Sequence, residues 1–300
     1  MDLNLVLLII EVEASNFDVA AYYQALRRFD QVFRQNCCGY LQSACIDCNE
    51  KYSCPYRAVF AQDLSSDPAV VRRHQKPPLP FAFKLKQAPN NESYPEICLV
   101  VAGKAINHLD LFIKAVRKMI EKIPTQNHGT APCVKGVYCL DYQMIRYSLD
   151  LSSYSSQNVI VLSSLDILEN PIGTENIRLV IESPLRLLCG GSELRRFDFS
   201  AFLRSQMRRC SSMFAYYGEG ELDIDFAGLS HEAGLVKCLD DGIRYSQPPW
   251  SMRPNHAGLV GASRFGSVTP GILSLLTLGA YINAGKLASF GFGAYSTEAC

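Results

Sequence analysis

A glycine-rich stretch near the end of the chain combines residue types that suit the binding of an anion. Lys286 is preceded by Gly285 and followed by Gly291 and Gly293. Glycine lets a backbone approach an anionic ligand closely, and the lysine ammonium supplies positive charge. The spacing predicts a phosphate-binding loop between an apolar helix over 269–283 and a terminal strand. The alternative that spacing alone leaves open is a glycine-rich turn before an edge strand.

The order of these residues differs from two common nucleotide-binding motifs. In the phosphate loop of nucleotide triphosphatases the lysine follows the glycines and a helix begins there, whereas here Lys286 precedes Gly291 and Gly293. The dinucleotide-binding fingerprint requires a strand before its glycines and a helix after them, which is the reverse of the order expected here. The sequence therefore disfavours both classes.

Because the chain has no net charge, any binding of nucleic acid must come from local basic patches on its surface. The chain has 300 residues, 48% hydrophobic and 19% charged, as in a soluble protein of two domains. Its formal net charge is +0, but the segment 184–210 carries +4 and the segment 216–241 carries −6. This segregation of charge could aim an anion at one face, and the alternative is that both segments are ordinary solvated surfaces.

Neither apolar run of the chain has the features of a targeting or membrane segment. The run at 3–12 has no basic leader and is followed by glutamates, so we expect a buried strand there. The uncharged run at 265–285 contains Pro270, glycines and hydroxyl side chains, which favour a core helix. We therefore expect a cytoplasmic protein without membrane contact.

Twelve cysteines without a secretory signal indicate a reducing compartment. Four of them, Cys37, Cys45, Cys48 and Cys54, lie close enough in sequence to suggest a structural zinc site, because thiolates two residues apart fit one face of a tetrahedral centre. The alternative is a set of free thiols in a compact insertion.

The periodicity of apolar residues predicts the same order of strands and helices in each half of the chain. The first half predicts strand 3–12, helix 17–35, strands 81–85 and 97–101, helix 109–122 and strands within 134–149 and 159–162. The second half predicts strand 177–187, helix 198–214, strand 258–265, the helix that begins at Thr269 and the terminal strand. We therefore expect an α+β protein with two tandem ferredoxin-like (RRM-like) domains. They are 1–170, with a cysteine-rich insertion at 37–60, and 171–300, with the glycine-rich loop at 285–293.

Several short motifs occur in an order that resembles a known family. In the second half they are Ser183-Pro184-Leu185-Arg186-Leu187, Gly190-Gly191, Arg208-Arg209-Cys210-Ser211, Gly258-Leu259-Val260-Gly261, Asn283-Ala284-Gly285-Lys286 and Phe290-Gly291-Phe292-Gly293. In the first half they are Leu26-Arg27-Arg28, Cys45-x-x-Cys48, Cys54-Pro55-Tyr56 and Gly103-Lys104-Ala105-Ile106. This series resembles the CRISPR-associated precursor-RNA processing endoribonucleases of the RAMP superfamily.

The resemblance implies binding of CRISPR repeat RNA and cleavage within the repeat without a metal or other cofactor. The 2′-hydroxyl would attack the adjacent phosphorus and leave a cyclic phosphate, and the crRNA would stay in an effector complex with other Cas subunits. We expect RNA contacts from basic side chains and from the loop, namely Arg186, Arg195, Arg196, Arg204, Arg208, Arg253, Arg264, Asn283, Gly285, Ser289, Gly291 and Gly293.

The catalytic groups are expected to include a histidine, which titrates near neutral pH. Relatives often carry a histidine just before the Gly-Lys pair, where this chain has Asn283, which does not titrate near pH 7. The candidates are His256, in a loop before the strand 258–265, and His108, for which the alternative is a structural helix cap. Lys286 would stabilise charge on the phosphoryl oxygens. The alternative function is a catalytically inactive crRNA-binding scaffold subunit.

Overall fold

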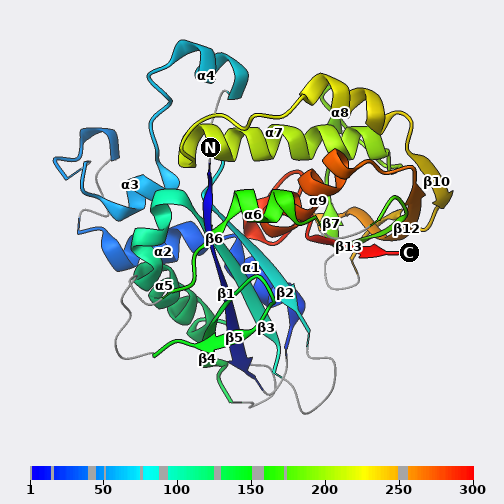
Figure 1. The fold of residues 1–300 in the computed structure, drawn as a ribbon. Helices are drawn as coiled ribbons and strands as arrows, with labels where there is room; N and C mark the ends of the chain where they lie inside the picture. Colours follow the sequence, from blue (N-terminus) through cyan, green and yellow to red (C-terminus); the bar gives the residue numbers. More distant parts are fainter. Residues whose placement is uncertain are drawn as a thin grey trace. The chain divides into compact units, whose positions relative to one another are not determined.

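The structure is a computed structural model whose chain can be followed by colour in Figure 1. It describes residues 2–14, 17–39, 45–50, 52–74, 77–87, 94–124, 130–150, 159–171, 174–248 and 256–300. The chain divides into two compact units, one of residues 5–71 and 75–162 and the other of residues 1–4, 72–74 and 163–300. The main boundary between the two units lies between residues 162 and 163, whereas the sequence predicted a domain boundary between residues 170 and 171. No helix in the described part of the chain combines the length and apolarity needed to cross a bilayer.

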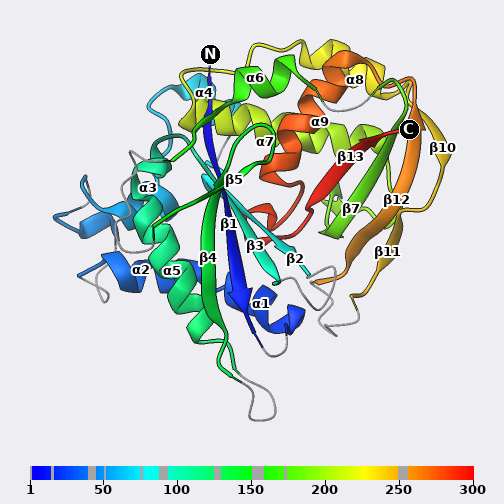
Figure 2. The same cartoon turned by 60° about the horizontal axis from the view of Figure 1, so that its bottom comes forward.

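The first unit contains an antiparallel sheet in the order β2-β3-β1-β4-β5, with the short β6 also paired to β1 (Figure 2). Its strands are β1 (Asn4–Glu13), β2 (Phe81–Lys86), β3 (Glu96–Ala102), β4 (Cys133–Leu140), β5 (Arg146–Ser148) and β6 (Leu162–Ser163). Its helices are α1 (Val19–Leu26), α2 (Phe29–Cys37), α3 (Pro55–Phe60) and α5 (Leu109–Glu121), while α4 (Pro68–His74) runs from this unit into the other. The short 3-10 turns η1 (Cys45–Asp47) and η2 (Gly103–His108) also belong here. This is the ferredoxin-like order, as predicted.

An aromatic cluster forms the core between the helices and the sheet of this unit. The ring of Phe29 on α2 lies 4.9 Å from that of Phe83 and 5.7 Å from that of Phe81, both on β2. Phe33 and Phe112 extend the cluster to α5, with ring centres 5.0 Å apart. Each such pair adds about 1 kcal/mol beyond simple burial. The apolar stripe of the predicted helix 109–122 is therefore confirmed as the face that packs here.

The predicted helix 17–35 is two helices in the structure. Asp18 caps α1 by accepting the amide of Ala20 at 2.9 Å. At the break, the Arg28 amide donates to the carbonyl of Ala25, a step of three residues instead of four, and the chain leaves α geometry (φ −106°, ψ 11°). The buried stripe continues through the break to Phe29. The spacing of apolar residues predicts which side of a helix is buried, but it does not detect a local break in the helix. This explains why the sequence predicted one helix instead of two.

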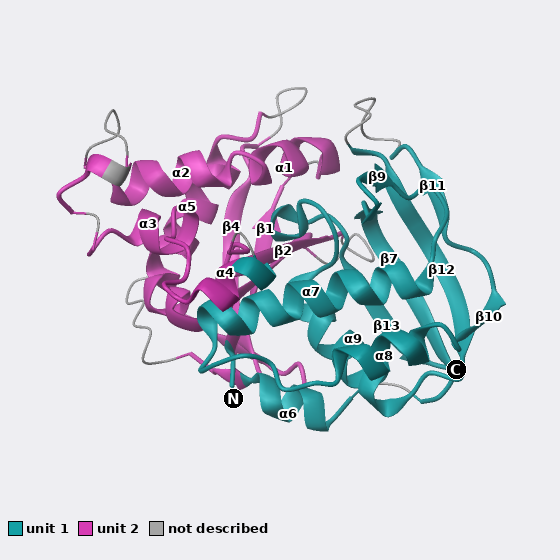
Figure 3. Cartoon of the chain, turned by 90° about the horizontal axis from the view of Figure 1, so that it is seen from above, with its two compact units in different colours: residues 1–4, 72–74, 163–300 teal, residues 5–71, 75–162 magenta. Residues whose placement is uncertain are grey.

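The second unit repeats the arrangement around a sheet in the order β10-β12-β7-β13, with β11 paired to β12 (Figure 3). Its strands are β7 (Ile177–Leu185), β8 (Leu188–Cys189), β9 (Ser192–Glu193), β10 (Lys237–Asp240), β11 (Arg244–Ser246), β12 (Gly258–Gly266) and β13 (Tyr295–Ala299). Its helices are α6 (Ser164–Glu169), α7 (Phe199–Tyr217), α8 (Phe226–Ala233), α9 (Pro270–Ile282) and the 3-10 turn η5 (Ala288–Phe290). The tandem ferredoxin-like fold is confirmed. The helices α6 and α8 and the strands β8, β9, β10 and β11 were not predicted.

Two well-capped helices, α7 and α9, pack against each other in this unit. Asp198 accepts the Ala201 amide at 2.6 Å at the start of α7, and Thr269 accepts the amide of Ile272 at 3.4 Å at the start of α9. These are the two residues at which the predicted helices 198–214 and 269–283 begin. Gly279 of α9 faces α7 so closely that an added Cβ would lie 2.9 Å from the side chain of Gln206. The close contact brings α7 against the end of α9, where the glycine-rich loop begins.

Candidate functional site

The loop between α9 and β13, residues 283–294, is tightly folded. Asn283 (φ 61°), Gly285 (φ 71°), Leu287 (φ 60°), Gly291 (φ 91°) and Gly293 (φ 62°) all have positive φ. A left-handed conformation costs a residue with a Cβ roughly 1–2 kcal/mol, so the non-glycine members must be held by their surroundings. The contacts described next supply that restraint.

The glycines allow the loop to pack on its own protein. A Cβ on Gly293 would collide with the carbonyl oxygen of Ala284, and one on Gly285 with that of Arg186. The amide of Gly293 donates to Pro184 at 3.1 Å, and the amide of Lys286 donates to Arg186 at 3.0 Å. Close approach to the segment 184–186 therefore explains these glycines without a ligand, and these amides are already used.

Asn283 is part of the internal structure of the loop. Its side chain is fully buried, and its Nδ2 donates to the carbonyl oxygen of Ala288 at 2.8 Å. Its own carbonyl accepts a hydrogen bond from Gln206 Nε2 of α7 at 3.3 Å. With φ 61° and ψ 177° it occupies a region that is almost exclusive to glycine. In this conformation it does not present the amide to RNA, in contrast to our expectation.

Arg209 of α7 binds the start and the middle of the loop, a role that the sequence analysis missed. Its Nε donates to the carbonyl of Ile282 at 2.8 Å, and its Nη2 donates to Ser289 Oγ at 3.3 Å. Burial lowers the pKa of the guanidinium to about 10, so it remains charged at neutral pH. Ser289, a predicted RNA contact, is buried here. The available signal was that Gln206 and Arg209, three residues apart, lie on the apolar side of the predicted helix.

Lys286 differs from its neighbours in the loop because its side chain is exposed. No ion pair of this ammonium is found among the residues that the structure describes. Its backbone is fixed through the bond to Arg186 while its charge faces solvent. Lys286 is therefore the residue of the loop that is best placed to meet a phosphate.

His256 lies behind the loop. Its ring centre is 5.6 Å from that of Phe292, and only 1% of the residue is exposed. The structure thus brings the predicted catalytic histidine to a loop residue but covers it. Arg253, which we also expected to contact RNA, lies outside the described residues.

His108 belongs to the other unit. It immediately precedes α5, but its side chain makes no capping hydrogen bond, so the structural alternative of a side-chain cap is not found. Burial lowers the pKa of its imidazole, against an opposing effect of the nearby Asp110 carboxylate. It is therefore neutral near pH 7, as a general base must be.

The predicted RNA-binding arginines fall into two groups. Some are already paired: Arg186 binds Glu193 through Nε at 2.7 Å and Nη2 at 3.3 Å, and Arg264 lies 3.7 Å from Asp240. The guanidinium of Arg195 lies 5.4 Å from the ring centre of Tyr245. Arg195 and Arg264 are nevertheless exposed, as are Arg196, Arg204 and Arg208. Among the described residues, Arg196, Arg204, Arg208 and Lys286 are the exposed cations of the predicted set for which no ion pair or ring contact is found.

The cysteine insertion does not form the predicted zinc site in the part that the structure describes. No three His, Cys, Asp or Glu side chains among the described residues come together as metal ligands. Cys37 donates from Sγ to the carbonyl of Phe33 at 3.3 Å, and burial raises the pKa of its thiol to about 11. Zinc at Cys37, Cys45, Cys48 and Cys54 remains a prediction without structural support.

Two family models match separate parts of the chain. Residues 179–295 match the model for the CRISPR-associated endoribonuclease Cas6, and residues 25–137 match a model described as an N-terminal domain, AF_1859_N. The Cas6 match runs from β7 through the whole glycine-rich loop. The second half of the chain is therefore similar to the CRISPR-associated endoribonuclease Cas6. No curated protein matches the sequence.

Solved structures share the fold across nearly the whole chain. Thermus thermophilus Cas6 (TTHB231) is 10% identical, with 98% of each chain covered and a TM-score of 0.56. A product complex of the Cas6 TTHA0078 is 15% identical, with 99% of this chain and 100% of that chain covered and a TM-score of 0.54. A partial Cas6-RT-Cas1–Cas2 complex is 12% identical, with 99% of this chain and 46% of that chain covered and a TM-score of 0.56.

Proposed function

We propose that this protein binds CRISPR repeat RNA and cleaves it within the repeat without a metal ion. The observation that carries the proposal is the match of residues 179–295 to the Cas6 endoribonuclease, which includes the loop where Lys286 is exposed. The exposed Arg196, Arg204 and Arg208 are further candidates for phosphate contacts. A relative has been solved in a complex with product, which supports retention of the cleaved RNA.

The proposed reaction needs only side chains and the RNA itself. The 2′-hydroxyl loses its proton to a general base and attacks the adjacent phosphorus, and the bond to the 5′-oxygen breaks. The products are a 2′,3′-cyclic phosphate and a 5′-hydroxyl, whose oxygen receives a proton. Lys286 stabilises the charge that develops on the phosphoryl oxygens, as preorganised cations do in phosphoryl transfer.

The general base is proposed to be His256, whose ring centre lies 5.6 Å from that of Phe292 in the loop. Because only 1% of it is exposed, RNA binding must uncover the ring before it can take the proton. His108 is the second candidate, and its lowered pKa keeps it in the neutral form. These two assignments make different predictions for single variants.

The decisive experiment incubates the purified chain with its cognate repeat RNA in EDTA. We expect cleavage, with a 5′-hydroxyl on the downstream fragment that a polynucleotide kinase can label directly. We expect His256→Ala to lower the single-turnover rate by 10²- to 10⁴-fold, the usual contribution of general acid–base catalysis. An unchanged rate in this variant would remove His256 from the mechanism.

A matched control is His231→Ala, since His231 is exposed on α8 and has no part in the proposal. Tight binding of the repeat by a folded protein without any cleavage would instead support the scaffold function. The Cas6-RT-Cas1–Cas2 assembly of a relative suggests that partner subunits of this chain are also Cas proteins. Co-purification from cells that express the neighbouring genes would test this.

A further inference from the structure

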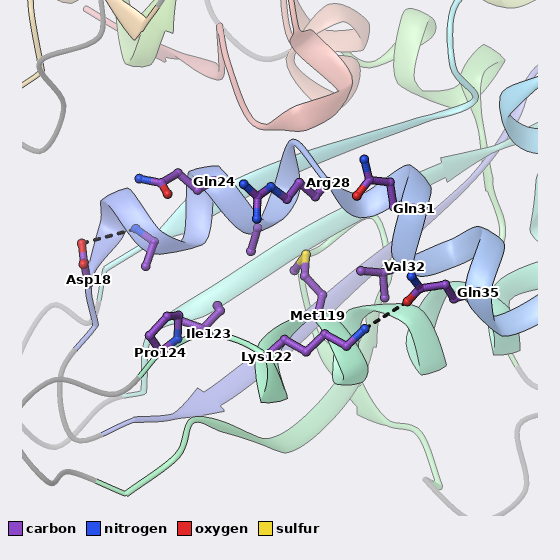
Figure 4. Close-up of a pocket in the computed structure, with 12 residues that line it drawn as sticks. Asp18, Gln24, Arg28, Gln31, Val32, Gln35, Met119, Lys122, Ile123 and Pro124 are labelled. Atoms are coloured by element: carbon purple, nitrogen blue, oxygen red, sulfur yellow. Dashed lines mark hydrogen bonds between the residues drawn. The ribbon is translucent and has the colours of Figure 1, made fainter.

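The first unit has a groove that the proposed cleavage site does not use. It lies between α1–α2 on one side and the C-terminal end of α5 on the other, with a volume of about 540 Å³ (Figure 4). All of its lining residues belong to the unit of residues 5–71 and 75–162. Ligand pockets commonly enclose roughly 300–1,000 Å³, so the groove is large enough for one nucleotide.

One wall of the groove is polar and regularly spaced. Gln24, Arg28, Gln31 and Gln35 follow one another at steps of four, three and four residues, which places them along one side of α1–α2. All four are exposed. Glutamine amides offer both donors and acceptors, the combination that pairs with the edges of nucleic-acid bases.

The floor of the groove is apolar. Val32 from α2, Met119 from α5 and Ile123, two residues after the end of α5, are buried beneath the polar wall. The space above them exists because Ala21 and Ala25 on α1 have short side chains. A flat base can lie on such a floor while its edge faces the glutamines.

The charge of the groove is net positive. Arg28 forms no ion pair with any described residue, and Lys122 Nζ donates to Gln35 Oε1 at 3.0 Å across the groove. The carboxylate of Asp18 is the opposing charge, but its Oδ1 already accepts the amides of Ala20 and Ala21. Two cations with one carboxylate engaged in a helix cap suit a ligand that carries a phosphate.

We propose that this groove is a second RNA-binding site, which holds one nucleotide of a single-stranded segment. Its phosphate lies between Arg28 and Lys122, its base lies on Met119 and Ile123, and the base edge is read by Gln31 and Gln24. The inference rests on the proposed RNA-binding function but not on cleavage. An acidic peptide of a partner protein would use the two cations, whereas the row of amides over an apolar floor favours a base.

The test measures binding of a fluorescent single-stranded RNA of ten nucleotides to the full chain. We expect Arg28→Glu and Lys122→Glu each to weaken binding about tenfold, as loss of one charge-assisted contact does. Each should also reduce the slope of log affinity against log salt by about one. The control is Lys118→Glu, one turn earlier on α5, which makes the same change of net charge at an exposed residue outside the groove. It should change affinity less than threefold.

A neutral variant separates the groove from charge in general. Ala25→Met keeps a good helix former and every charge but fills the space above the floor, so we expect a similar loss of affinity. Crosslinking with 4-thiouridine in the same RNA should mark peptides from α1–α2 or the end of α5. Equal affinities for Arg28→Glu, Lys122→Glu and Lys118→Glu, or crosslinks confined to the second unit, would overturn the proposal.

The two proposals fail in different ways. If Lys286→Ala abolishes repeat binding while the groove variants bind normally, the groove proposal is wrong and the proposed function stands. If the groove variants lose affinity while Lys286→Ala binds and cleaves normally, the groove stands and the assigned loop is wrong. Binding of an acidic peptide that is lost in Arg28→Glu, with RNA binding unaffected, would assign the groove to a protein partner and overturn the RNA site.

Discussion

Asn283 donates a hydrogen bond from Nδ2 to the carbonyl oxygen of Ala288, 2.8 Å away, across the first turn of the glycine-rich loop. Because the asparagine is buried with positive φ, this bond holds a strained residue in place. We expect Asn283→Ala to lower the free energy of unfolding by about 2 kcal/mol, since it loses the bond and keeps the strain. Asn283→Gly loses the same bond but relieves the strain, so its loss in urea unfolding should be smaller. Equal losses would contradict the assigned conformation.

Gly293 tests how tightly the loop packs. Gly293→Ala would push a Cβ into the carbonyl oxygen of Ala284, so the variant should lose more than about 3 kcal/mol or fail to fold. Gly191→Ala is the matched control, because Gly191 also has positive φ (83°) but no atom within 4 Å of an added Cβ. It should lose about 1 kcal/mol in thermal or urea unfolding. Similar losses in both variants would mean that the packing at Gly293 is looser than described.

Lys286 should contribute to RNA binding and not to stability. Its side chain is exposed, so Lys286→Ala should change the free energy of unfolding by less than about 0.5 kcal/mol. Affinity for the repeat RNA should fall about tenfold, and the salt slope should fall by about one. Lys237→Ala, at an exposed lysine of β10, is the control for nonspecific charge. If both variants bind equally well, the ammonium of Lys286 does not contact phosphate.

Adjacent arginines on α7 should behave oppositely. Arg209→Leu leaves the carbonyl of Ile282 without its partner, so we expect a loss of about 2–3 kcal/mol in unfolding free energy. Arg208→Leu removes an exposed charge and should change stability by less than about 0.5 kcal/mol. For RNA affinity we expect the opposite order: Arg208→Leu should weaken binding more than Arg209→Leu, because the exposed Arg208 is a candidate for a phosphate contact. An Arg209 variant as stable as the Arg208 variant would show that the loop does not depend on this side chain.

The pH dependence of stability should include a contribution from His74. Its Nδ1 lies 3.1 Å from Ser212 Oγ, and burial lowers the pKa of the ring below its usual value of 6.5, against the raising effect of Glu221 and with a further lowering by Arg73. The unfolded chain therefore takes up this proton at higher pH than the folded chain. The stabilisation is complete above about pH 6.5 and declines as the pH falls below that value.

His74→Gln removes the titration and keeps a polar side chain. Its unfolding free energy should fall less between pH 7.5 and 5.5 than that of the unchanged protein, as measured by urea denaturation at each pH. An identical slope for both proteins would show that His74 titrates alike in the folded and unfolded chains.

The regular parts of this fold could be predicted from sequence because they depend on local patterns. The stripe of α5, the caps Asp198 and Thr269 and the twofold repeat of elements all follow from spacing and side-chain type. The strand β10 in the acidic segment could not be predicted in this way. All of its residues are exposed, so its sequence lacks the alternation of apolar and polar residues that marks a half-buried strand. The break between α1 and α2 was not predicted, because the helical spacing of apolar residues continues through it without interruption.

The loop shows why residue types alone misassigned part of the site. Glycines and an asparagine suit a phosphate, but they also suit a backbone that folds against itself, and only the contacts with Pro184, Arg186 and Ala288 separate the two. Lys286 is exposed, as expected of a lysine, which is rarely buried without a partner. The role of Arg209 could not be predicted, because the Ile282 carbonyl and the Ser289 hydroxyl that it binds lie 73 and 80 residues away in the chain.

The outer face of the second sheet carries one more constraint on how RNA can be bound. Asp240, Arg264, Arg178 and Glu298 are cross-strand neighbours on β10, β12, β7 and β13, with two arginines in the middle and a carboxylate at each end. Arg178 reaches Glu298 at 2.8 Å, and Arg264 lies 3.7 Å from Asp240. Such a row neutralises itself and offers no aromatic ring to a base. Unlike a sheet that stacks nucleotides on its strands, this row gives an unpaired base no ring on which to stack.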